Sequence, residues 1–128
     1  MIFEVKITIE INNEKQEIEL ICDDTTLSIT LNLENQSSQI YTDRDFYKCF
    51  GILRKNNPDI RFFCKGSKIN VHPSSMSSQM SLGLKAYELA FRKTPSLEDV
   101  VYIFDYEEEN LTNNPEEQRS FYLNWITS

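Results

Sequence analysis

The single histidine and the three cysteines are the residues best suited to covalent chemistry. Cys64 lies eight residues before His72, so the histidine could serve it, or a nearby serine, as a general base. Nucleophilic catalysis also needs an oxyanion hole and a group that orients the base, and no motif marks either. A lone histidine beside a proline and several serines is more often structural or exposed. We therefore predict no catalytic residue and keep a small cysteine or serine hydrolase as the weaker alternative.

Metal and cofactor chemistry has little support in the sequence. Asp23 and Asp24 form a pair without the spaced oxygen ligands of a calcium loop, and the run Glu107–Glu109 lacks the glycine of such a loop. No Cys-x-x-Cys indicates a zinc ribbon, and the odd number of cysteines does not indicate a disulfide framework. Three glycines leave little from which to build a phosphate-binding backbone loop. We predict neither a metal nor a cofactor.

The middle of the chain mixes cationic and aromatic residues. Residues 42–97 contain four acids and ten bases, and some of these bases lie close to Phe50, Phe62 and Phe63. Such a mixture can bind single-stranded nucleic acid. We favour the alternative that these cations pair with acidic flanks of the same fold, and we expect Phe62 and Phe63 to point to opposite faces of a strand. The net charge of −7 also argues against a general nucleic-acid binder.

The last 31 residues carry the acidic excess, with eight acids and one base. Acids in the first turn of a helix are explained by the helix dipole, but the run at 105–109 is not. We expect a negative patch that steers a basic partner, with solubility alone as the simpler explanation. The predicted partner-binding residues are Asp99, Asp105, Tyr106, Glu107, Glu108, Glu109, Glu116 and Glu117.

Length and composition indicate one globular domain over residues 1–128, since 40% of the residues are hydrophobic. No apolar run is long enough to span a membrane. The first residues lack the apolar stretch of a signal peptide, and Glu4 interrupts them. Together with unpaired cysteines, these features predict a cytoplasmic protein without a membrane partner.

The elements that must position these residues follow from hydrophobic periodicity. Residues 2–11, 18–22 and 27–33 alternate between apolar and polar, which predicts three antiparallel strands in a meander. Thr42 and Asp45 resemble a capping box before a helix whose stripe is Phe46, Cys49, Phe50 and Leu53.

The second half of the chain is predicted by the same signals. We expect short strands at 60–64 and 69–71, a loop at 72–81, a doubly covered strand at 82–91, a helix from Ser96 to Phe104 and a final helix from Pro115. The fold class is therefore α+β, an antiparallel sheet packed with about three helices.

Residues 64–125 contain a series of short motifs. The motifs are C-x-G, V-x-P-x-x-M, M-x-x-G-x-K-A-Y, V-x-x-I-F-D and Q-x-x-F-x-x-x-W. The matching positions are Cys64, Gly66, Val71, Pro73, Met76, Met80, Gly83, Lys85, Ala86, Tyr87, Val100, Ile103, Phe104, Asp105, Gln118, Phe121 and Trp125. With these motifs the chain resembles small bacterial immunity proteins of toxin–immunity loci, in particular those of contact-dependent growth inhibition systems.

The resemblance implies a small non-catalytic protein that binds a cognate toxin domain and neutralises it in the cytosol. Many such toxins are nucleases with a basic surface, which an acidic patch would attract. The alternative from another class is an intracellular adaptor or regulator that binds some other protein without enzymatic activity.

Overall fold

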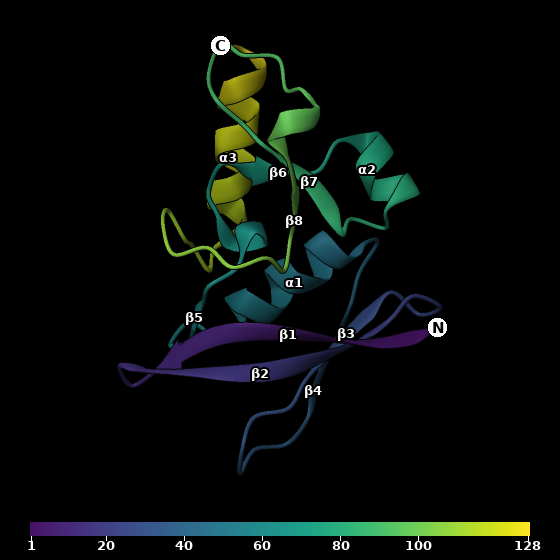
Figure 1. Ribbon diagram of the computed structural model, residues 1–128, viewed down its shortest axis with the longest axis vertical. Coiled ribbons are helices and arrows are strands. Elements are labelled where there is room, and N and C mark those ends of the chain that lie inside the picture. The colour runs from purple at the N-terminus through teal and green to yellow at the C-terminus, as the bar shows by residue number, and fades with distance from the viewer.

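The N-terminal half of the chain forms the predicted antiparallel meander in the computed structural model, which describes residues 1–128 (Figure 1). β1 (Ile2–Ile11) pairs with β2 (Glu14–Asp23) along its whole length. Asn12 and Asn13, which join them, both have positive φ angles, as a tight hairpin turn requires. β2 pairs in turn with β3 (Ser28–Leu31). The period-two alternation buries one face of this sheet, as predicted.

Two short strands complete a five-stranded sheet in the order β4-β3-β2-β1-β5. β4 (Gln39–Thr42) pairs with β3, and β5 (Arg61–Phe62) pairs with β1. β4 is not among the predicted elements, because it has only two apolar residues and follows a polar run. β5 is shorter than the predicted strand at 60–64.

Helix α1 (Phe46–Lys55) packs on the buried face of this sheet and carries the predicted apolar stripe. Its N-cap is Asp45, whose side chain accepts a hydrogen bond of 2.8 Å from the backbone N–H of Lys48. The prediction of a capping box begun by Thr42 is therefore wrong, because Thr42 ends β4. α1 lies between the large sheet and the rest of the molecule (Figure 1).

The C-terminal half forms a three-stranded sheet in the order β6-β7-β8. β6 is Val71–His72, β7 is Lys85–Glu88 and β8 is Val100–Tyr102. β7 is central, as the doubly covered strand predicted at 82–91, but it is only four residues long. Helix α3 (Pro115–Ile126) lies against this sheet and begins as predicted, with Asn114 as its N-cap.

Two predictions for this half are wrong. Ser96 and Asp99 do form a capping box, but it starts only a 3₁₀ turn, and the chain then enters β8 instead of a helix through Phe104. β-branched Val100 and Val101 pair with β7, which satisfies their backbone groups without a helix. The predicted loop at 72–81 contains helix α2 (Ser75–Met80), which Ser74 caps.

The two halves share one hydrophobic core around α1. The ring of Phe50 packs edge-to-face with Phe62 of β5 at 5.8 Å and with Phe104 at 5.3 Å. The architecture is α+β, as predicted. None of the helices is both long and apolar enough to cross a membrane.

Candidate functional site

Four of the eight acidic residues of the last 31 residues lie in residues 105–113, between β8 and α3, a segment that we call the acidic loop. Backbone hydrogen bonds hold it beside residues 63–69. The N–H of Lys65 donates to the carbonyl of Asp105 at 2.8 Å, and the N–H of Glu107 donates to the carbonyl of Phe63 at 3.2 Å. Isolated bridges at Cys64–Tyr106 and Lys68–Leu111 continue this pairing. The acidic loop is thus fixed along most of its length.

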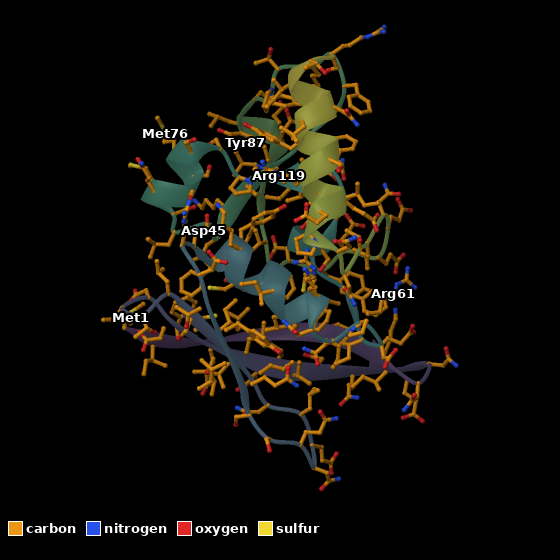
Figure 2. All side chains as sticks on the ribbon, turned by 180° about the vertical axis from the view of Figure 1, so that it is seen from behind. Met1, Asp45, Arg61, Met76, Tyr87 and Arg119 are labelled. Carbon is orange, nitrogen blue, oxygen red and sulfur yellow. The ribbon has the colours of Figure 1, made fainter.

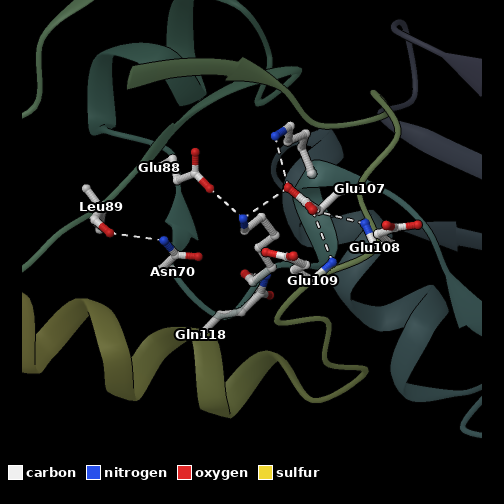
Figure 3. Close-up of polar contacts among 9 residues, drawn as sticks. Asn70, Glu88, Leu89, Glu107, Glu108, Glu109 and Gln118 are labelled. Carbon is white, nitrogen blue, oxygen red and sulfur yellow. Dashed lines mark hydrogen bonds and ion pairs between the residues drawn. The ribbon is translucent and has the colours of Figure 1, made fainter. Parts of the chain in front are cut away.

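The side chain of Glu107 holds the acidic loop in its conformation through hydrogen bonds (Figure 3). This side chain is 12% exposed, and one carboxylate oxygen accepts hydrogen bonds from Lys65 at 2.9 Å and Lys68 at 3.0 Å. The other oxygen accepts the backbone N–H groups of Glu108 and Glu109, each at 3.0 Å. Lys68 also pairs with Glu88 of β7 at 2.6 Å. Glu107 therefore ties the loop to the turn at 65–68 and, through Lys68, to β7.

The surroundings of Glu107 favour its ionised form. Burial alone would raise the pKa of this carboxyl, but the hydrogen bonds from Lys65, Lys68 and the two backbone N–H groups outweigh it and lower the pKa to about 2. Glu107 is consequently a charged structural group, and little of it is left to contact a partner.

Tyr106, just before Glu107, faces outward and is 49% exposed. Its ring stacks on buried Phe63 at 5.8 Å between centroids. Its hydroxyl accepts a hydrogen bond from Lys15 at 3.0 Å and lies 3.2 Å from a carboxylate oxygen of Glu108, to which it donates. Lys15 comes from the start of β2, so the tip of the β1–β2 hairpin joins the acidic loop here. Tyr106 is an aromatic residue held in one orientation among carboxylates.

The other predicted partner-binding residues are less closely grouped. Asp105, Glu108 and Glu109 are exposed in the acidic loop, and Glu116 and Glu117 are exposed in the first turn of α3. Asp99 lies at the opposite end of β8 from the acidic loop, where it pairs with Lys93 at 3.1 Å. The structure therefore brings the residues of 105–109 together and separates Asp99 from them.

The cations of the middle segment divide into paired, buried and free groups. Lys65 and Lys68 pair with acidic residues of the fold, as predicted. Arg54 is fully buried, which the sequence did not indicate, and its side chain donates to the carbonyl of Thr112 at 3.1 Å and to Gln118 at 2.7 Å. Burial lowers the pKa of Arg54 to about 10, so it remains charged at neutral pH.

Gln118, on the buried side of α3, completes this polar network. Its amide donates to the carbonyls of Gly66 and Lys68, both at 2.8 Å, while its oxygen accepts from Arg54. The network links α1, α3 and the turn at 65–68, which itself supports the acidic loop. Sequence periodicity could not identify it, because its members lie 50 to 64 residues apart.

The candidate nucleophile and base are placed in structural roles. Cys64 is fully buried, and burial raises the pKa of its thiol to about 12. The ring of His72 stacks on Tyr122 with centroids 4.1 Å apart. A thiol held protonated and away from solvent is a poor nucleophile, so Cys64 is not placed for nucleophilic attack in this fold.

The motif residues behind the family resemblance fall into two groups. Some are buried and explained by packing; for example, a Cβ at Gly66 would lie 2.8 Å from the Cβ of Ile103. Others are exposed: Met76 and Met80 of α2 are 70% and 82% exposed, and Met76 projects away from the molecule (Figure 2). Comparison with protein-family models and with curated proteins finds no match for this chain.

Proposed function

We propose that this protein is a non-catalytic immunity protein that binds a basic toxin domain in the cytosol and neutralises it. The observation that carries the proposal is the acidic loop, in which Glu107 is used internally and its neighbours Tyr106, Glu108 and Glu109 are presented outward. A loop fixed in advance loses little conformational entropy on binding.

The chemistry of this surface suits a cationic partner. Exposed carboxylates accelerate association with a basic surface, and a tyrosine ring supplies a rigid apolar contact with few torsions to freeze. Glu108 and Glu109 supply the charge, and Tyr106 supplies the anchor. The motif resemblance to immunity proteins points to the same class of partner.

The first experiment is protection in cells. A toxin domain encoded next to this gene is expressed with and without this chain, and growth is measured together with co-purification of the pair. We expect growth to be restored and a stable complex to be recovered. Equal killing in both cultures would refute the proposal.

A second experiment tests the surface. The double variant Glu108→Lys/Glu109→Lys should slow association with the toxin by about tenfold or more at low salt and weaken the salt dependence of the rate. The matched control is Glu17→Lys/Glu19→Lys, which makes the same charge change on exposed positions of β2. If both variants slow association equally, net charge and not the acidic loop governs binding.

A further inference from the structure

A second surface hollow, formed mainly by residues 44–79, is lined by cationic and neutral polar side chains and by Pro73, with no carboxylate among the lining residues. It lies where α1, α2 and α3 approach one another. Its lining includes Arg44, Lys48, His72, Ser75, Gln79 and Tyr122. We call this the basic hollow. In a chain of net charge −7, a concavity without an acidic lining residue is a local exception to the average.

The two permanent cations of the basic hollow differ in their partners. The guanidinium of Arg44 has no hydrogen-bond or ion-pair partner, whereas Lys48 forms a long ion pair with Asp45, at 3.7 Å. The Asp45 carboxylate is already occupied by the N–H of Lys48 and the hydroxyl of Ser78. By contrast, Lys65, Lys68 and Lys93 all have carboxylate partners at 3.1 Å or less.

An adjoining hollow adds a further free cation. Arg119 of α3 lines it together with Lys48 and His72, which are common to both hollows. Arg119 lies on the side of α3 that faces α2 (Figure 2) and has no ion-pair partner. Asp43 and Glu116 also line this adjoining hollow and offset its positive charge. The basic hollow, which contains Arg44, has no acidic lining residue to do the same.

His72 also lines the basic hollow, and only one of its two ring nitrogens has a partner. Its Nδ1 lies 2.8 Å from the carbonyl of Pro73, which can only accept, so Nδ1 carries a proton and Nε2 has no partner. Stacking on Tyr122 and an edge contact with Tyr47 at 5.5 Å hold the ring in place.

The protonation of His72 responds to its surroundings. Burial lowers its pKa; the Pro73 carbonyl and Asp45 raise it, and Lys48 and Arg119 lower it. The ring is therefore neutral at pH 7, and an anion bound beside it would favour the imidazolium, which donates from Nε2.

We propose that the basic hollow binds a phosphate group, as inorganic phosphate or as the terminal monoester of a small metabolite. Arg44 and Lys48 supply the charge, the side chains of Ser75 and Gln79 supply neutral donors, and His72 adds a donor when it takes up a proton. The site requires no residue of the acidic loop, so it does not depend on the proposed toxin-binding function.

The test is titration of the full chain with sulfate, phosphate and glycerol 3-phosphate at constant ionic strength, followed by NMR shifts and calorimetry. Constant ionic strength removes general screening from the comparison. Sulfate stays a dianion from pH 5.5 to 7.5, so a change in its affinity over that range reports the protein and not the ligand. We expect saturable sulfate binding that weakens as the pH rises.

Two variants and one control make the result specific. Arg44→Gln should weaken binding by about tenfold, the value of one charge-assisted hydrogen bond. His72→Asn should remove the pH dependence of sulfate binding. Arg92→Gln, another exposed arginine outside the hollow, should change neither.

The outcomes separate the two sources of the phosphate group. Equal affinity for phosphate and glycerol 3-phosphate supports a site for the free anion, and tighter monoester binding supports a metabolite. The absence of saturable binding by all three ligands, or equal loss in the Arg44→Gln and Arg92→Gln variants, would overturn the proposal.

Discussion

The acidic loop and the basic hollow use charge in opposite ways. In the acidic loop, the central carboxylate of Glu107 is mostly removed from water and is satisfied by Lys65, Lys68 and backbone N–H groups. In the basic hollow, Arg44 remains in solvent without a partner, and Lys48 has only a distant one. Charge satisfied within the fold defines shape, whereas charge left unsatisfied on a concave surface is available to a ligand. Local charge density alone therefore does not identify a binding residue.

The largest loss of stability is expected at Gln118, whose hydrogen bonds connect α1 and α3 with the turn that supports the acidic loop. Gln118→Ala removes the acceptor of buried Arg54 and the donors to Gly66 and Lys68. The substitution leaves Arg54 with only its hydrogen bond to Thr112 and the buried Gly66 carbonyl without a donor, which should lower the free energy of unfolding by about 4 kcal/mol. Urea unfolding measures it, with Ser120→Ala on the exposed side of α3 as the control. A loss below 1 kcal/mol would show that the regions are independently supported.

Replacing Gly83, which lies beside the basic hollow, should give the next largest loss of stability. Gly83 has a φ of +77°, and a Cβ there would lie 2.8 Å from the Cγ of Asp45. Gly83→Ala should lower the free energy of unfolding by about 3 kcal/mol, through backbone strain and displacement of the α1 N-cap. Hydrogen exchange should localise the change to α1 and α2 and leave the acidic loop protected. Loss of protection in both regions would contradict their separation.

Replacing the internal carboxylate should have a smaller, pH-dependent effect. Glu107→Gln should lower the free energy of unfolding by about 2 kcal/mol at pH 7. Because the folded pKa is depressed to about 2, the wild-type advantage is present above pH 4.5 and is lost as the pH falls toward 2. Urea unfolding of both proteins between pH 7 and 2 tests this. A difference that persists at pH 2 would mean that shape and not charge is responsible.

The smallest effect concerns the histidine. NMR titration of His72 should give a midpoint below the ordinary value of 6.5, because burial disfavours the imidazolium. The unfolded chain then binds the proton more readily, so stability is lost as the pH falls below about 6.5. Arg119→Gln should raise the midpoint by a few tenths of a unit. A midpoint at or above 6.5 without added anion would contradict the described packing.

Local patterns predicted the elements that are stabilised locally. The alternation of residues 2–11 specifies a strand with one buried face, and Asn114 with Pro115 specifies a helix start, so β1 and α3 are as predicted. β8 is not, because Val100 and Val101 fit both helical spacing and a short strand, and pairing with β7 decides between them. The pairing of two strands cannot be predicted from a short stretch of sequence that contains only one of them.

The candidate site was predicted only in part for the same reason. The run Glu107–Glu109 is uniform in sequence, and nothing in it distinguishes the first residue from the other two. What separates them is Lys65 and Lys68, about 40 residues earlier in the chain. Arg44 likewise cannot be distinguished in the sequence from the paired cations of residues 42–97, because the absence of a partner is a property of the fold.

The three buried thiols provide a measurement of local opening that needs no engineering. Cys22 and Cys49 lie in the core between the large sheet and α1. The backbone of Cys64 forms an isolated antiparallel β-bridge with that of Tyr106 in the acidic loop. Burial raises the pKa of all three thiols to between about 11 and 12, so a labelling reagent reacts with each only after its region unfolds. Mass spectrometry of labelled peptides would therefore rank the opening rates of the two halves in the native protein.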